Sequence, residues 1–261
     1  MQRLVNAWVW TTTVLVVILG FFYVSIVWLL TAPFDPGRYA AGRAFRHLAV
    51  ACTWLNPYWH FHTSGFTIRD PRRPYVVVAN HESYADIFLV SHLKWEMKWL
   101  AKDTIFRIPI MGWMMRMAGD IPIIRGNRGS GVQALEECRE RLAKRVSVMI
   151  FPEGTRTRSD ELLPFKDGAF QLAVSTGTPI IPIAIAGTRY AMAKGSFSFR
   201  RANAICRVLE PIETTGLNGS DVAGLRERTR SLISDARHEL QRELAREASE
   251  RTPRARGVTN Q

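Results

Sequence analysis

The sequence predicts an α/β fold in which a mostly parallel central sheet is flanked by helices, with an N-terminal membrane helix or two-helix membrane motif. Three observations support this prediction. Short β-branched runs, typical of fully buried strands, alternate with segments of helical periodicity. The N-terminal segment is long and apolar. The 261 residues, 47% apolar and 22% charged, are sufficient for one folded domain with a sizeable core.

The N-terminal segment has the length and composition of a membrane helix. Residues 4–34 contain no charged side chain. As a helix, residues 7–30 would be about 36 Å long, which exceeds a hydrocarbon core of about 30 Å. A second apolar stretch, residues 47–61, is shorter and more polar, and would lie in the membrane interface. A two-helix hairpin that dips into one leaflet therefore stays open beside a spanning helix.

The charges that flank this segment predict its orientation. Arg3 precedes it, whereas Arg38, Arg43 and Arg46 follow it. The positive-inside rule therefore places the rest of the chain on the cytoplasmic side of the inner (cytoplasmic) membrane.

The patterns divide the chain into four parts. Residues 1–62 are predicted to form membrane-anchoring helices, and residues 63–215 an α/β domain. Residues 216–250 have the periodicity of an amphipathic helix packed on that domain, with a charged outer face. Residues 251–261 are rich in Arg, Pro and Thr, and are predicted to be a disordered tail.

Within the α/β domain, strands and helices can be placed in order. Strands are predicted over residues 75–79, 119–125, 146–151 and 180–186, with an outer strand over residues 204–209. Helices are predicted from Ser83 toward Leu93, after a Gly-rich loop at residues 126–131, and over residues 168–175. The helix after the Gly-rich loop places four apolar residues at helical spacing: Val132, Leu135, Cys138 and Leu142.

The overall charge indicates an anionic partner. Lys and Arg total 35 against 23 for Asp and Glu, a net charge of +12 at pH 7. Phosphate, nucleic acid or an acidic membrane surface would fit this charge. The three cysteines, Cys52, Cys138 and Cys206, are far apart in the sequence, so they support neither a disulfide framework nor a zinc site.

The first candidate motif is His81-x4-Asp86, directly after the strand at residues 75–79. Five residues along an ideal helix turn two side chains about 140° apart, so both cannot lie mid-helix and meet. With His81 in a loop and Asp86 in the first helical turn, Asp86 can accept the His81 ring N–H and make His81 a general base. Two other interpretations stay open: a capping box with Ser83 explains Asp86 alone, and a histidine near a strand end is often structural.

The second candidate motif is Glu153-Gly154-Thr155-Arg156, in the loop after the strand at residues 146–151. Arg156 can bind phosphate oxygens through its planar guanidinium, and Gly154 lets the backbone approach a ligand closely. Glu153 would fix Arg156 or hydrogen-bond a substrate hydroxyl. An ordinary turn with surface arginines is the alternative.

Arg125 ends a third strand and would bring a further positive charge to the same edge of the sheet. Ligands of open α/β sheets bind at the carboxyl ends of the strands, where the two motifs and Arg125 would converge.

Several ordered blocks together resemble one family. They are N-H-E-S-Y-A-D, F-P-E-G-T-R, G-D-I-P-I-I-R, the Pro164–Phe170 block and the Ile181–Ala184 block, together with Lys102, Ile105, Pro109 and Gly112. The segment from residue 75 to 187 is therefore similar to the glycerolipid acyltransferases, in particular the 1-acylglycerol-3-phosphate acyltransferases.

The resemblance implies roles for individual residues and for partners. His81 would be the base and Asp86 its support, while Arg156 would hold the acceptor phosphate, with further binding positions at Glu153, Gly154, Thr155 and Arg125. The substrates would be a lysophospholipid acceptor and an acyl thioester of coenzyme A or acyl carrier protein. We expect an anionic membrane as a partner, no nucleic acid, and no cofactor or metal.

The mechanism that follows is ester formation, and the acyl chain needs an apolar groove. Residues that would line such a groove or simply form core are Trp95, Trp99, Ile110, Met111, Trp113, Met114 and Met117.

Other functions stay open. The acceptor could be another lysolipid, such as a lyso-ornithine lipid. A membrane-anchored serine hydrolase would use Ser83 or Ser175 as its nucleophile. A nucleic-acid-binding protein is a third alternative, but the sequence contains no matching nucleic-acid-binding module.

Overall fold

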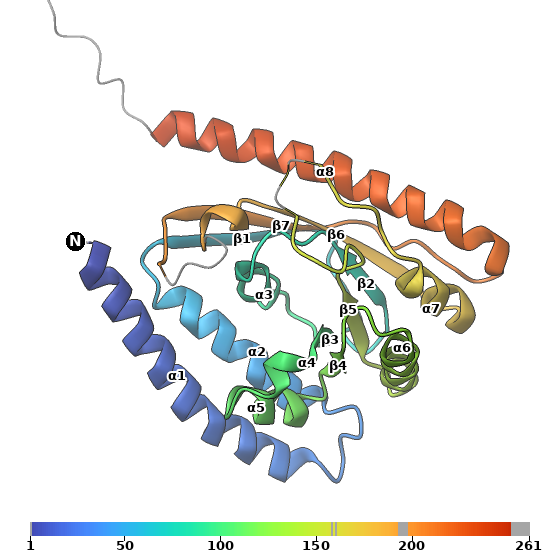
Figure 1. Cartoon of the computed structure of the whole chain (residues 1–261), viewed down its shortest axis with the longest axis horizontal. Coiled ribbons are helices and arrows are strands. Elements are labelled where there is room, and N and C mark those ends of the chain that lie inside the picture. The colour runs from blue at the N-terminus through green and yellow to red at the C-terminus, as the bar shows by residue number, and fades with distance from the viewer. Residues whose placement is uncertain (1, 158, 160, 193–197, 252–261) are drawn as a thin grey trace, which may run out of the picture.

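The computed structural model describes residues 2–157, 159, 161–192 and 198–251 (Figure 1). A single sheet of seven strands has the order β1-β7-β6-β2-β5-β3-β4. The strands are β1 (Trp59–Gly65), β2 (Val76–Ala79), β3 (Met97–Lys102), β4 (Ile121–Ile123), β5 (Ser147–Ile150), β6 (Ile180–Ala186) and β7 (Ala202–Val208). Strands β2 to β6 run parallel, whereas β7 is antiparallel to β6 and β1 is parallel to β7. The predicted mostly parallel α/β sheet is confirmed.

Helices cover both faces of the sheet (Figure 1). They are α1 (Gln2–Thr31), α2 (Tyr39–Trp54), α3 (Ala85–Val90), α4 (Asp103–Phe106), α5 (Met111–Ala118), α6 (Arg128–Ala143), α7 (Gly168–Thr176) and α8 (Val222–Arg251), with two 3-10 turns, η1 (Thr188–Tyr190) and η2 (Gly219–Asp221). Helices α6, α7 and α8 lie on one face, and α3 lies on the other.

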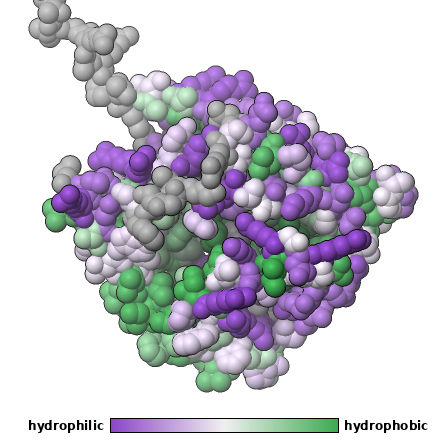
Figure 2. All heavy atoms as spheres, viewed as in Figure 1, coloured by the Kyte–Doolittle hydropathy of each residue, from purple (hydrophilic) through white to green (hydrophobic). Residues whose placement is uncertain are grey.

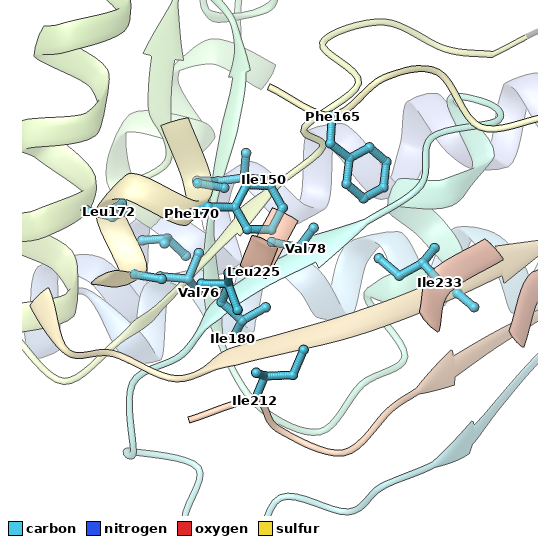
Figure 3. Close-up of a cluster of buried hydrophobic side chains, with 14 of the residues drawn as sticks. Val76, Val78, Ile150, Phe165, Phe170, Leu172, Ile180, Ile212, Leu225 and Ile233 are labelled. Atoms are coloured by element: carbon cyan, nitrogen blue, oxygen red, sulfur yellow. The ribbon is translucent and has the colours of Figure 1, made fainter. Parts of the chain in front are cut away.

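The core follows from alternation along the central strands. On β2, Val76 and Val78 face α6, α7 and α8, while Val77 faces α3, and all three are fully buried. The close-up in Figure 3 shows Phe170 of α7 and Ile233 of α8 in the first of these layers. Burying a side chain of this size contributes about 1.5 to 3 kcal/mol, so both faces stabilise the central strands.

Two predictions in this domain need correction. Strand β7 is not an outer strand, because β1 pairs with it and forms the edge. The predicted Gly-rich loop at residues 126–131 is mostly helical: the Asn127 side chain accepts a hydrogen bond from the Ser130 backbone N–H, and α6 begins at Arg128. Capping by Asn127 overrides the low helix propensity of the two glycines that follow. Val132 is 65% exposed and therefore does not belong to the buried face of α6.

Strand β1 lies across a predicted boundary. It begins at Trp59, so the sheet starts before residue 63, and residues 59–61 belong to it rather than to an interfacial segment. At the other end of the chain, most of the predicted disordered tail, residues 252–261, lies outside the described residues.

Helix α1 packs on α2 and α5 with one side and presents apolar residues on the other. Gly20 permits the close approach to α2, because a Cβ there would lie 2.3 Å from Leu48 Cδ1. Within the described residues, α1 is the one helix long and apolar enough to cross a membrane. Figure 2 shows apolar surface gathered where α1 lies. Its exposed apolar side chains include Leu15, Leu19, Phe22, Leu29 and Leu30.

A buried ionic cluster attaches α2 to the sheet. Lys98 Nζ of β3 donates to Glu96 Oε1 at 3.0 Å and to the Arg38 carbonyl at 2.8 Å, and Arg46 pairs with Asp120. Burial raises the pKa of Glu96 and lowers that of Lys98. Breaking a buried ion pair would leave an uncompensated charge, so this cluster fixes α2, and with it α1, relative to the sheet.

Candidate active site

The candidate site lies where β2, β5 and β6 end. His81 follows β2, the Glu153 loop follows β5, and Thr188 follows β6, so three parallel strands bring three segments to one edge. Asn80 holds this edge together: its side chain donates to the Ile185 carbonyl at 2.9 Å and accepts from the Ile185 N–H at 2.8 Å. This pair of bonds mimics a strand pairing between β2 and β6.

His81 and Asp86 form the predicted dyad. His81 Nδ1 lies 2.7 Å from Asp86 Oδ2, with the Asp86 side chain fully buried. A carboxylate accepts hydrogen bonds, so His81 Nδ1 is the donor, which leaves Nε2 as the ring nitrogen that can take up a proton. Within the described part of the chain, no residue hydrogen-bonds Nε2. The His81 ring stacks on Phe151, with centroids 4.1 Å apart, which fixes its plane.

Asp86 is also held by backbone amides of the loop that precedes α3. Asp86 Oδ2 accepts from the backbone N–H of Glu82 at 2.8 Å and of Ser83 at 3.1 Å, and Ser83 Oγ accepts from the Ala85 N–H at 3.2 Å. The Thr188 hydroxyl donates to Asp86 Oδ1. The predicted capping box with Ser83 is half formed: Asp86 accepts from the Ser83 N–H, but the Ser83 hydroxyl accepts from Ala85 rather than from Asp86, and Tyr84, the N-cap residue of α3, makes no side-chain cap hydrogen bond. The backbone amides orient the Asp86 carboxylate toward His81.

Glu153 ties the second loop to the first. Its Oε1 accepts from the His81 backbone N–H at 2.8 Å, and its Oε2 accepts from the Leu163 N–H at 3.1 Å. The Thr157 N–H donates to the His81 carbonyl at 2.9 Å. Burial raises the pKa of Glu153, and the two backbone N–H donors oppose this rise. The expectation that Glu153 fixes Arg156 is corrected: both carboxylate oxygens hold backbone amides instead.

The Arg156 guanidinium packs on the ring of Tyr84, which lies in the chain between His81 and Asp86. Its guanidinium carbon is 3.8 Å from the centroid of the Tyr84 ring, and Tyr84 is the residue before α3. Gly154 has φ 69°, a left-handed conformation in which any other side chain is strained, so the turn favours glycine. Thr155 is exposed. The turn therefore presents a half-buried guanidinium, held over the ring by a cation–π contact, at the edge of the sheet.

Arg125 shares this edge but is separated from the dyad. It lies exposed in the turn after β4, which is three strands from β2 in the sheet. With about 4.8 Å between neighbouring strands, this places the two strands about 14 Å apart. The structure joins His81, Asp86 and Glu153 by hydrogen bonds, brings Arg156 near them through its contact with Tyr84, and leaves Arg125 apart.

An apolar cavity of about 360 Å³ adjoins the site. Its wall includes Ile87 and Phe88 of α3, Tyr84 just before that helix, and Trp99 of β3. Tyr84 is the ring beneath Arg156, and Trp99 lies 6.1 Å from Phe151, the ring that stacks on His81. The cavity therefore runs from the neighbourhood of the dyad toward α1 and α2.

The residues expected to line an apolar groove divide into groups. Trp99, Met111 and Met114 line the cavity, and Trp95 lines a different pocket. Ile110 and Met117 pack among side chains of α1 and α2, and Trp113 is 52% exposed.

The structure adds three residues for which no role was predicted: Glu82, which lies inside the first motif, Thr188 and Arg237. Glu82 Oε1 accepts from Arg237 Nε at 2.8 Å, although 155 residues separate them in the chain. One signal in the sequence pointed to Arg237, which lies at helical spacing between Ile233 and Leu240 on the apolar side of α8.

The described residues contain no group of three or more His, Cys, Asp or Glu side chains that could hold a metal ion. The groups that the site does contain are a hydrogen-bonded imidazole, a guanidinium and an apolar cavity. This set can remove a proton, bind an anion and bury a hydrocarbon chain.

Comparisons with known proteins agree with this geometry. The model of the Acyltransferase family matches residues 61–186, which contain His81, Asp86 and Arg156. A chloroplastic 1-acyl-sn-glycerol-3-phosphate acyltransferase of Brassica napus is 38% identical over 159 residues, which are 59% of this chain and 46% of that protein. The human 1-acyl-sn-glycerol-3-phosphate acyltransferase beta is 32% identical over 192 residues, 70% of this chain and 69% of that protein.

A solved structure is similar over nearly the whole chain. The crystal structure of the 1-acyl-sn-glycerophosphate acyltransferase PlsC from Thermotoga maritima has a TM-score of 0.77 and 26% sequence identity, and the match covers 92% of this chain and 96% of that one. By contrast, the chain spans about half the length of the Brassica napus relative.

Proposed function

Because the chain belongs to the family of 1-acyl-sn-glycerol-3-phosphate acyltransferases, we propose that it moves a fatty acyl group from an acyl thioester to the free hydroxyl of lysophosphatidic acid, giving phosphatidic acid. The observation that carries the proposal is the 2.7 Å hydrogen bond between His81 Nδ1 and Asp86 Oδ2 at the edge of the sheet where the Arg156 loop also lies.

His81 is the general base in this proposal. Its Nε2 takes the proton from the glycerol hydroxyl while that oxygen attacks the thioester carbonyl of acyl-coenzyme A or acyl carrier protein. The tetrahedral intermediate collapses, the carbon–sulfur bond breaks, and the thiolate takes the proton back from His81. A positioned base contributes about 10² to 10⁴ in rate. The reaction converts a thioester into an ester, and it needs no enzyme nucleophile, metal or cofactor.

Arg156 binds the acceptor phosphate, and the apolar cavity holds an acyl chain. A guanidinium matches phosphate oxygens with paired N–H donors, and Tyr84 holds Arg156 from below. The cavity wall that Tyr84 and Trp99 form begins beside the dyad, so an acyl chain seated there would have its carbonyl end near His81. Gly154 and Thr155 shape the turn that presents Arg156, and Arg125 adds positive charge farther along the edge.

The chain lies against the cytoplasmic face of the inner membrane in this proposal, with its catalytic domain in the cytoplasm. Helix α1 contacts the domain at both ends: Val9 packs with Trp59 and Val24 packs with Met114. A helix held along its length in this way, with an apolar outer side, favours insertion into one leaflet over a full crossing. Each Lys or Arg near anionic lipid adds about 1 kcal/mol to binding.

The experiment is an acyl-transfer assay with the purified full chain. Lysophosphatidic acid and acyl-coenzyme A are supplied, phosphatidic acid is measured by mass spectrometry, and a parallel reaction uses acyl carrier protein as the donor. Phosphatidic acid that forms only when acceptor, donor and protein are all present is the expected result. Acylation of a lyso-ornithine lipid with none of lysophosphatidic acid would reject the proposed acceptor.

A serine hydrolase is the alternative, and the structure argues against Ser175. This residue lies in the last turn of α7, where its hydroxyl donates to the Leu172 carbonyl at 3.2 Å and accepts from Arg139 at 3.1 Å. We therefore expect Ser175→Ala to keep acyl transfer within about twofold of the wild-type rate, because no substrate-binding group is lost. Acceptor-independent release of fatty acid that Ser175→Ala abolishes would support the hydrolase.

A further inference from the structure

We propose that Arg237 of helix α8 is a positioning residue for acyl transfer, which holds the His81 loop through Glu82 and balances the charge beside Asp86. The inference rests on the proposed function. It assigns a role to the C-terminal helix, which lies outside the segment that the family model matches, residues 61–186.

Arg237 and Glu82 form a buried ion pair. Arg237 Nε donates to Glu82 Oε1 at 2.8 Å, and both side chains are 1% exposed. The Nη2 atom of Arg189, in the turn after β6, lies 3.4 Å from the same oxygen, with its side chain 21% exposed. A buried carboxylate that loses its partner is strongly destabilised, so Arg237 fixes where Glu82 can lie.

Glu82 is connected to the dyad on both sides. It follows His81 directly in the sequence, and its backbone N–H donates to Asp86 Oδ2 at 2.8 Å. The Thr188 hydroxyl lies between the two carboxylates, since it donates to Asp86 Oδ1 and is 3.4 Å from Glu82 Oε2. A shift of Glu82 would therefore move both the His81 backbone and the hydrogen bonds that hold Asp86.

The second part of the inference concerns charge. Glu82 and Asp86 are two buried carboxylates side by side, and the cations that face Glu82 are Arg237 from α8 and Arg189 from η1. Burial raises the pKa of Glu82, and among the neighbouring charges Arg237 opposes this most, ahead of the repulsion from Asp86. Without Arg237, burial would act on Glu82 with its strongest opposing cation gone, so the carboxyl would take up a proton or turn toward solvent, and either change would displace the loop that carries His81.

Packing alone does not explain an arginine at this position. Ile233 and Leu240, the neighbours of Arg237 on the buried side of α8, are both 0% exposed, and a leucine would continue that apolar side. A buried arginine is retained here together with a carboxylate in the catalytic loop, which points to a role in that loop.

The test compares three variants by steady-state kinetics. In Arg237→Gln, we expect kcat to fall about tenfold or more and the KM for lysophosphatidic acid to stay within about threefold, because the loop that carries the base is displaced while the groups proposed to bind the acceptor remain. In the double variant with Glu82→Gln, no unpaired buried charge is left, and kcat should recover at least half of the loss on a logarithmic scale. Arg237→Lys keeps the charge and should lower kcat less than Arg237→Gln.

A matched control uses an ion pair of the same helix. Arg226 pairs with Asp167 at 2.6 Å on the surface, with side chains 27% and 47% exposed, and Arg226→Gln should keep kcat within about twofold of the wild type. A kcat within about twofold of the wild type in Arg237→Gln, or one that does not recover in the double variant, would overturn the inference.

If Arg237→Gln does not fold, Glu82→Gln alone leaves the buried Arg237 unpaired and should lower kcat about tenfold, with the acceptor KM within about threefold, and an unchanged kcat would contradict the positioning role. If the wild-type chain forms no phosphatidic acid, the proposed function fails, while the NMR chemical shifts of the labelled His81 ring in Glu82→Gln and in the wild type still test whether the ion pair positions the loop. Identical shifts would then overturn the inference.

Discussion

Replacing Glu153 by glutamine separates two roles that its carboxylate could have. In the structure, both oxygens accept from backbone amides, His81 N–H at 2.8 Å and Leu163 N–H at 3.1 Å. A glutamine has one carbonyl oxygen and one NH₂ group, so it can replace only one of these bonds and turns a donor toward the other amide. The variant should therefore lose stability and loosen the loop that carries His81.

The size of the effect follows from these contacts. A hydrogen bond to a charged group contributes about 1.5 to 3 kcal/mol. For a chain of this size, about 1 kcal/mol corresponds to about 2 to 4 °C in Tm, so Glu153→Gln should lower Tm by about 3 to 12 °C. Because a displacement of about 1 Å in a reacting group can cost about 10² in rate, kcat should fall between about tenfold and 10².

The matched comparison is Arg156→Gln, which removes the guanidinium proposed to bind phosphate. That variant should raise the KM for lysophosphatidic acid by about 10 to 10², the equivalent of about 1.5 to 3 kcal/mol, with little change in Tm. Glu153→Gln should change the same KM by less than about twofold. Thermal unfolding and steady-state kinetics measure both quantities. If Glu153→Gln raised the acceptor KM and left Tm unchanged, the carboxylate would bind substrate and the assignment would be refuted.

Further predictions concern packing and the cavity. Gly112→Ala should lower Tm, because a Cβ would lie 2.0 Å from the Phe106 carbonyl oxygen, whereas Gly131→Ala, with nothing within 4 Å, should raise Tm by about 1 to 4 °C. Equal Tm values for the two variants would contradict the packing of α5. Burial raises the pKa of Cys52, which lines the apolar cavity, to about 11. Its alkylation rate should therefore rise about tenfold per pH unit up to about pH 10, and bound acyl-coenzyme A should slow it. A rate that levels off near pH 8.5, or one unaffected by the acyl thioester, would count against this placement of Cys52.

The dyad could be predicted from the sequence because its geometry is local. His81 and Asp86 are five residues apart in a strand–loop–helix unit, so the chain needs only one turn to bring them together. Strand β6 could also be predicted, because its seven buried residues form a continuous apolar run that contains four isoleucines.

The strands that the sequence patterns did not predict, β3 and β1, contain charged or polar residues that are uncommon in buried strands. Strand β3 contains Lys98, which is fully buried and paired with Glu96. A hydrophobic pattern does not predict a lysine in a buried strand, but the paired carboxylate compensates its charge. Strand β1 continues an apolar stretch and then becomes polar at the sheet edge, where pairing with β7 decides its structure.

Long-range contacts were out of reach for a different reason. The roles of Glu153 and Arg237 depend on which backbone amide or carboxylate lies opposite them, and the partners are 72 and 155 residues away. Only the three-dimensional arrangement of β2, β5 and α8 decides those pairings.

The central claim is that His81 is the base that activates the acceptor hydroxyl. The most direct measurement is the initial rate of phosphatidic acid formation by His81→Ala, compared with the wild type at equal concentrations of folded protein. We expect the rate to fall by about 10² to 10⁴, because the groups that bind the substrates remain while the proton acceptor is lost. A rate within about twofold of the wild type would contradict the claim.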